Sequence, residues 1–167
     1  MAGPALAAVL TEDHSSPHAS QAQTEGPRGV AAPLRHHRGM PHRSRLAILL
    51  LDLPPEVHPA GLDFWSAATG HPVEPDMADP SWHSLGSFSD GFHLEVQRTG
   101  EGTPPRWHVD VETDDIPAEV ARLEALGARR RADMGSFWQM TDPAGLVFCV
   151  VGIQTGEAFE RYAATWP

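Results

Sequence analysis

Apolar and polar residues alternate along several short stretches of the chain, most clearly over residues 107–113. Because successive side chains of a strand point to opposite faces, this period of two predicts a β-strand with one buried face. An Ala-, Leu- and Glu-rich stretch follows and ends at Gly127, which predicts a helix over about 116–126. Asp114 or Asp115 supplies the N-cap of that helix. The pattern therefore indicates a strand followed by a helix.

The same order of elements occurs twice, with a spacing that shrinks along the chain, and this indicates a diverged duplication. The first copy predicts a helix over about 57–69 and strands over residues 46–52, 82–88 and 92–98. The second copy predicts, around its helix, strands over residues 107–113, 128–133, 137–141 and 146–152. We expect an α+β fold in which paired βαβββ modules form a cupped mixed sheet, with the helices on its outer face.

Three segments divide the chain. Residues 1–42 are rich in Pro, Ala and His and lack a sustained period, so we expect them to be disordered and dispensable. The predicted folded domain spans residues 43–152, with its modules at about 43–98 and 106–152. Residues 153–167 are predicted to be a tail with a short helix, whose aromatic side chains pack on the domain or on a partner.

Composition and charge exclude several classes of function and partner. The formal net charge of −10 repels phosphate groups, so we expect neither a nucleic-acid partner nor an anionic membrane surface. The chain has no lysine, which excludes Schiff-base chemistry and a P-loop lysine. A single cysteine, Cys149, and the lack of a signal-peptide pattern after Met1 lead us to expect a cytoplasmic protein. Met40, just before the first predicted strand, is a second candidate for the biological start.

Alternation also sorts the candidate functional residues by face. The helices need an apolar sheet face to pack on, so the polar face is left to line the cup. That face is expected to hold Glu95, Gln97, His108 and Cys149. A purely structural role is the alternative for each: His108 can hydrogen-bond a neighbouring carboxylate, and Cys149 can act as a small apolar residue. Trp138 is the aromatic residue most expected to touch a ligand.

The order of elements and several short motifs resemble the vicinal oxygen chelate superfamily, which includes glyoxalases, bleomycin resistance proteins and extradiol dioxygenases. The motifs are Phe64-Trp65 and Thr69-Gly70 near the end of the first helix, Gln97-Arg98, Pro105-Arg106-Trp107-His108, Asp142-Pro143-Ala144-Gly145 and Phe148-Cys149. Within the superfamily the chain is similar to the glyoxalase-like group. The resemblance covers about residues 43–152 and implies a dimer.

Metal-dependent members of the superfamily place four ligands on the first, fourth, fifth and eighth strands. By resemblance these positions correspond to Leu46, Glu95, His108 and Cys149. Leu46 has no donor atom, and Cys149 replaces the usual carboxylate. We therefore expect no cofactor. The alternative is one divalent ion, zinc or similar, held by Glu95, His108 and Cys149.

Two functions follow from this resemblance. In the first, the cup binds a small organic molecule without a complete metal site, and the ligand-binding residues are His93, Gln97, Asp110, Trp138 and Cys149. In the second, the protein is a metal-dependent lyase, isomerase or dioxygenase with Glu95 and His108 as its catalytic residues. We expect a homodimer in either case.

Overall fold

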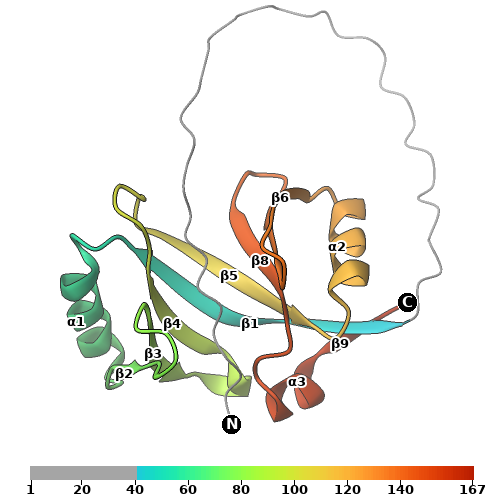
Figure 1. Cartoon of the computed structure of the whole chain (residues 1–167). Coiled ribbons are helices and arrows are strands. Elements are labelled where there is room, and N and C mark those ends of the chain that lie inside the picture. The colour runs from blue at the N-terminus through green and yellow to red at the C-terminus, as the bar shows by residue number, and fades with distance from the viewer. Residues whose placement is uncertain (1–40) are drawn as a thin grey trace, which may run out of the picture.

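The computed structural model describes residues 41–167, which form three α-helices, one short 3₁₀ helix and nine strands (Figure 1). The first module contains β1 (His42–Leu53), α1 (His58–Thr69), β2 (Glu74–Pro75), β3 (Trp82–Ser87), η1 (Ser89–Gly91) and β4 (His93–Arg98). The second contains β5 (Arg106–Thr113), α2 (Ile116–Ala125), β6 (Arg129–Asp133), β7 (Trp138–Thr141) and β8 (Val147–Gly152). The tail contains α3 (Glu157–Tyr162) and β9 (Ala164–Trp166). None of the helices in this range is long and apolar enough to cross a membrane.

All nine strands belong to one mixed sheet, and the predicted α+β fold of paired βαβββ modules is confirmed. The strand order is β2-β3-β4-β1-β5-β8-β7-β6, with β9 added beside β1. Each module contributes a parallel pair, β1 with β4 and β5 with β8. The two modules join where β1 runs antiparallel to β5. This central pair places side chains from both halves of the chain next to one another.

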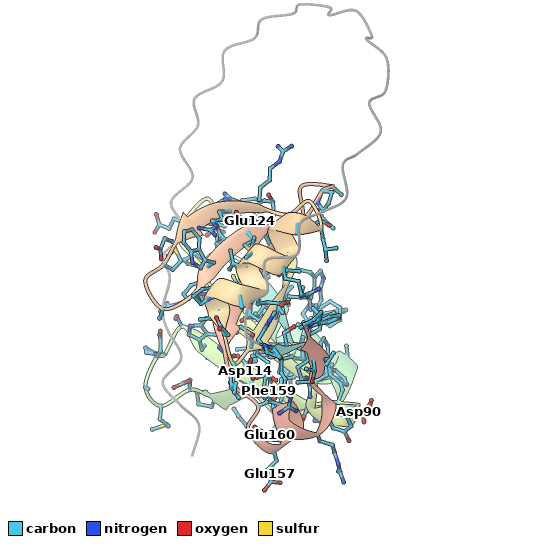
Figure 2. The ribbon with its side chains drawn as sticks, turned by 90° about the vertical axis from the view of Figure 1, so that its right-hand side faces the viewer. Asp90, Asp114, Glu124, Glu157, Phe159 and Glu160 are labelled. Carbon is cyan, nitrogen blue, oxygen red and sulfur yellow. The ribbon has the colours of Figure 1, made fainter. Side chains whose placement is uncertain are left out.

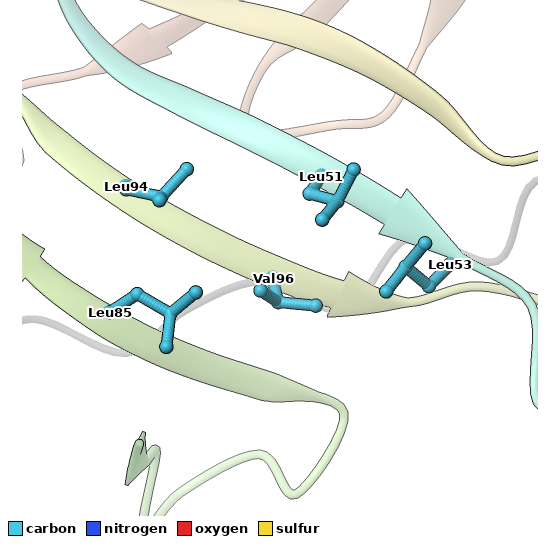
Figure 3. Packing of buried hydrophobic residues seen from close by; sticks show 5 residues of the cluster. All are labelled: Leu51, Leu53, Leu85, Leu94 and Val96. Carbon is cyan, nitrogen blue, oxygen red and sulfur yellow. The ribbon is translucent and has the colours of Figure 1, made fainter. Parts of the chain in front are cut away.

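One face of the sheet is apolar and carries α1 and α2. Figure 3 shows the cluster under α1, made of Leu51, Leu53, Leu85, Leu94 and Val96. The cluster between α2 and the sheet is made of Val120 of the helix and of Val111, Met140, Phe148 and Val150 of the strands. Burying each of these side chains contributes about 1.5 to 3 kcal/mol to folding. The opposite face, which we call the cup face, holds the polar side chains of the alternating strands.

The predicted helix ends agree with the structure. Asp115 caps α2 by accepting a hydrogen bond from the backbone N–H of Ala118 at 3.0 Å. After α2, Gly127 has a φ of 103°, a left-handed conformation that favours glycine. Gly70 ends α1 in the same way, with a φ of 74°. These two glycines therefore terminate the helix of each module.

β1 begins at His42, earlier than predicted, because its first residues pair with β9 at the opposite end of the chain. The predicted disordered segment, residues 1–42, lies outside the described residues except for Pro41 and His42. His42 is only 4% exposed, and its Nε2 lies 2.8 Å from a carboxylate oxygen of Glu119. His42 is therefore part of the folded domain.

The C-terminal tail packs on its own domain. Phe159 is 1% exposed and lies under the guanidinium of Arg43, whereas Glu157 points away from the ribbon in Figure 2. In β9, the indole N–H of Trp166 donates a hydrogen bond to Ser44 at 2.7 Å. The predicted short helix is present as α3, and β9, which no sequence pattern indicated, completes the tail.

Candidate functional site

Three side chains from neighbouring strands form a row across the centre of the cup face. Leu50 on β1 pairs with Glu95 on β4 and, on its other side, with His108 on β5. Residues that are directly paired across strands point to the same face of the sheet, so the three side chains are neighbours. Alternation had predicted that Glu95 and His108 share a face, and the strand register confirms it.

The residue between them is Leu50 and not Leu46, which corrects the position predicted by resemblance. Leu46 pairs with Val111, a core residue under α2, so it points to the helix-covered face. It is also 55% exposed. The reason is an irregularity between Leu46 and Ile48, where one extra residue reverses the alternation of β1.

Both ring nitrogens of His108 contact carboxyl groups on this face. Its Nδ1 lies 3.1 Å from Oδ2 of Asp52, and its Nε2 lies 3.5 Å from Oδ1 of Asp110. All three residues are at most 7% exposed. Burial alone would lower the pKa of His108, but the contacts with Asp110 and Asp52 outweigh burial and raise this pKa to about 12. His108 therefore keeps its proton at neutral pH, between the carboxyl groups of Asp52 and Asp110, and burial raises the pKa of Asp110.

Asp52 has a second cationic partner. The Nε of Arg106 donates a hydrogen bond to Oδ2 of Asp52 at 2.8 Å, the oxygen that also faces His108. The other oxygen, Oδ1 of Asp52, is buried and has no hydrogen-bond partner within residues 41–167, and the same is true of Oδ1 of Asp110. Buried carboxylate oxygens normally have partners. The cluster therefore retains hydrogen-bonding capacity that the described residues do not satisfy.

Glu95 carries a perturbed carboxyl group. Burial, together with the negative charges of Asp110 and Asp76, raises its pKa to about 7. A carboxyl group with this pKa exchanges its proton near neutral pH, which is the property of a general base or acid.

Cys149 lies beside this cluster, because it pairs directly with Asp110 across β5 and β8. The thiol is buried, and burial raises its pKa above the ordinary value. His108, Asp110 and Cys149 each offer one ligand atom, and these atoms all lie within 4.8 Å of one another. The structure thus brings Cys149 to the predicted side of the sheet, in a group that includes Asp110 and does not include Glu95.

Two of the other predicted ligand-binding residues lie on the cup face and one does not. His93 pairs with Ile48 and Gln97 pairs with Asp52, so both share the face of Glu95. Trp138 pairs with Val150 and packs on the core cluster beside α2, so it does not share the face of Glu95. Its neighbour in sequence takes that place: Gln139, 4% exposed, pairs with Cys149.

Sequence reasoning missed Asp52, Arg106 and Gln139 as members of the site. Alternation along β5 places Arg106 on the face of His108, so that signal was available. Asp52 follows an unbroken apolar run, in which no alternation shows the face of any residue. Gln139 was missed because the faces of the strand predicted over residues 137–141 were not assigned from the sequence.

The chain segment before α3 covers one end of the cup face. The carboxylate of Glu112, which is fully buried, accepts hydrogen bonds from the backbone N–H groups of Gln154 and Thr155 at 2.7 and 2.9 Å. Arg45 lies 3.6 Å from the same carboxylate. The segment therefore depends on a buried carboxylate of β5 for its position.

The residues present do not fit the four-strand metal site that the resemblance implies. Such a site needs a donor atom from the first strand beside the ligands of the fourth and fifth strands. In this chain Leu50 occupies the place between Glu95 and His108, and a leucine side chain has no donor.

A sequence comparison identifies the family. The profile of the family described as a glyoxalase-like domain matches residues 48–151, which is more than half of the chain. No curated protein sequence matches. The matched range begins in β1 and ends in β8, so it contains both modules.

Solved structures with a similar arrangement have low sequence identity. The Mn(II)-bound glyoxalase from Novosphingobium aromaticivorans is 17% identical, with a TM-score of 0.44, over 65% of this chain and 40% of that chain. The 2,2',3-trihydroxybiphenyl 1,2-dioxygenase from Sphingomonas wittichii strain RW1 is 16% identical, with a TM-score of 0.46, over 66% and 40%. A methylmalonyl-CoA epimerase variant from Streptomyces coelicolor is 15% identical, with a TM-score of 0.43, over 65% and 96%.

The present chain thus spans less than half the length of the matched glyoxalase and dioxygenase chains. The family itself is shown by the sequence profile, which agrees with the motifs and with the two βαβββ modules of the sheet. The chain belongs to the glyoxalase-like domain family.

Proposed function

We propose that this protein binds a small organic molecule on the cup face, without the four-ligand metal site of its metal-dependent relatives. The observation that carries the proposal is the row Glu95–Leu50–His108, in which an apolar side chain replaces a donor between two polar ones. An apolar centre flanked by a few polar groups is typical of sites for small organic ligands.

The charges around this row favour a ligand with a cationic or strongly polar group. Glu95 has its pKa raised by burial and by Asp110 and Asp76, so an ammonium or guanidinium group beside it would relieve the repulsion among these carboxylates. His108 and Arg106 already have a carboxylate partner in Asp52. A cationic ligand therefore has a partner available near Glu95, whereas an anionic one does not.

A second candidate function is catalysis, as a lyase, isomerase or dioxygenase. The pKa of Glu95, raised to about 7, favours it because a general base works best when its pKa is near the working pH. In that case Glu95 takes the proton and the imidazolium of His108 stabilises or protonates an oxygen of the substrate. This candidate differs from the first in requiring turnover and not only binding.

Calorimetric titration with matched cationic, neutral and anionic fragments of the same carbon skeleton tests the proposal. The cationic fragment should bind most tightly. The variant Glu95→Gln should lose about 1.5 to 3 kcal/mol of its binding free energy, the contribution of one charge-assisted hydrogen bond. The control Glu124→Gln, on the exposed end of α2, should leave binding unchanged. A preference for the anionic fragment, or equal binding by Glu95→Gln, would contradict the proposal.

A further inference from the structure

We propose that His108, Asp110 and Cys149 form a site for one divalent ion of the zinc class, built from the second module alone. The ligand atoms of the three residues all lie within 4.8 Å of one another, and each residue is at most 7% exposed. Nε2 of His108 and Oδ1 of Asp110 are 3.5 Å apart, close to the separation of two ligands around a tetrahedral zinc ion.

The strands hold this group in a fixed geometry. Asp110 and Cys149 are directly paired across β5 and β8, so their side chains leave the sheet side by side. His108 precedes Asp110 by two residues on the same strand and therefore points to the same face. Positions in the middle of paired strands are held more rigidly than positions in loops, and this favours a preformed site.

A second observation concerns the hydrogen bonding of Asp110. Its Oδ1 is buried and lies 3.5 Å from Nε2 of His108, but it accepts no hydrogen bond in the described part of the chain. On the other side of His108, Asp52 contacts Nδ1 at 3.1 Å, which leaves Nε2 directed at Asp110. A carboxylate on one ring nitrogen and a metal ion on the other is the usual arrangement around metal-binding histidines.

The donor set indicates the class of ion. One imidazole nitrogen, one carboxylate oxygen and one thiolate suit zinc or cobalt, whereas calcium and magnesium require oxygen ligands. When the divalent ion binds, the imidazolium of His108 and the thiol of Cys149 each release one proton to solvent, so the net charge of the cluster is unchanged. Three protein ligands leave a fourth position open, as in catalytic zinc sites.

His108 and Cys149 stand at the fifth- and eighth-strand positions that the resemblance implies, but the site differs from that of the metal-dependent relatives because Asp110 is the third ligand and neither the first nor the fourth strand contributes one. Leu50 and Glu95 occupy those positions and lie outside the group of three. The inference goes beyond the proposed function and does not depend on it, since the ion is held whether or not an organic molecule binds near Glu95.

Titration of the full-length protein with Co(II) tests the site, because cobalt takes the place of zinc and reports its ligands by absorbance. One equivalent should produce an intense thiolate-to-cobalt band in the near ultraviolet, which zinc then displaces. Cys149 is the only cysteine of the chain, so the histidines outside the described residues cannot produce this band. Cys149→Ser should remove the band, and Asp110→Asn should weaken cobalt binding by at least about tenfold.

Two further variants make the result decisive. Asp52→Asn should weaken binding by about 10- to 100-fold while keeping the thiolate band, because Asp52 only orients His108. Glu95→Gln removes a neighbouring charge but no ligand, so it should keep the thiolate band and change cobalt affinity by less than Asp110→Asn does. Circular dichroism of each variant verifies that it is folded. The absence of a thiolate band in the folded wild type at one equivalent of cobalt would overturn the site. A loss of affinity in Glu95→Gln equal to that in Asp110→Asn would overturn this choice of ligands.

Discussion

Oδ2 of Asp52 and Nδ1 of His108 lie 3.1 Å apart, although the two residues are 56 positions apart in the chain. Asp52 belongs to the first module and His108 to the second, so this contact joins the modules inside the polar face. Arg106 strengthens the junction by donating to the same oxygen of Asp52. The orientation of the central imidazole therefore depends on both halves of the duplicated fold.

Replacing His108 by Gln should destabilise the protein more at pH 6 than at pH 9. The pKa of His108 in the folded protein is raised from 6.5 to about 12, so its contribution to stability is fully present below pH 6.5 and is lost as the pH rises toward 12. The variant leaves Asp52 and Asp110 without their shared cation, at a cost of about 3 to 5 kcal/mol at pH 6. Urea unfolding of the wild type and the variant at both pH values measures the difference in their free energies of unfolding. This difference should be smaller at pH 9 than at pH 6.

Replacing Glu95 by Gln should stabilise the protein at pH 8 and have little effect at pH 4. A carboxyl group whose pKa is raised from 4.5 to about 7 keeps its proton longer in the folded state, so the free energy of unfolding falls as the pH rises from 4.5 to 7. Removing the charge should recover about 1 to 3 kcal/mol at pH 8. Thermal unfolding at both pH values tests this. A variant that is less stable than the wild type at pH 8 would show that the carboxylate has a cationic partner.

Two N-terminal truncations should differ sharply in stability. A chain that begins at Pro41 should unfold at nearly the same temperature as the full chain, because residues 1–40 lack apolar periodicity. A chain that begins at Arg43 also loses His42, whose ring contacts the buried carboxylate of Glu119 at 2.8 Å. That loss should cost about 1 to 3 kcal/mol. Equal stability of the two truncated chains would contradict the assignment of His42 to the domain.

Deleting residues 164–167 should destabilise the domain by about 1 to 3 kcal/mol. The deletion removes β9, the hydrogen bond from Trp166 to Ser44 and the contact of Arg122, whose guanidinium carbon lies 3.9 Å from the centre of the Trp166 ring. Deleting Pro167 alone is the control and should have no effect. The measurement is chemical unfolding followed by tryptophan fluorescence.

We also expect a homodimer in solution, with a mass of about twice 18.1 kDa by light scattering. Phe64 is 62% exposed and Trp107 is 42% exposed, and both contact the ring of Trp65, so a group of aromatic side chains faces solvent. Exposed apolar groups of this kind often mark interfaces between proteins. Phe64→Ser should then weaken the dimer without unfolding the monomer, whereas a monomeric wild type would count against the interface.

Alternating strands were predicted well, and the reason is visible in β5. There the pattern alone placed His108 and Asp110 on one face and Val111 on the other, as the strand register shows. In β1 the residues form an unbroken apolar run, which shows no period of two. The irregularity between Leu46 and Ile48 was therefore not detectable from the sequence. For the same reason the sequence did not show that Leu50, and not Leu46, lies beside His108.

The contacts that form the site could not be predicted for a different reason. Asp52 and His108 meet only because β1 and β5 pair in one particular register, and strand register depends on packing between distant segments. The same register places Trp138 against the core cluster beside α2 and puts its neighbour Gln139 opposite Cys149. Local sequence patterns specify which elements form, whereas the neighbours of each side chain depend on the assembled sheet.

The pairing of β9 with the start of β1 brings the two ends of the folded domain together. Trp166 and His42 are partners in the strand register, so a short peptide can connect them without crossing the sheet. Opening the chain at the same time within residues 99–105, between β4 and β5, would give a circular permutant in which the second module precedes the first. Because the modules associate through the β1–β5 pair, the domain should tolerate an exchange of their order in the gene.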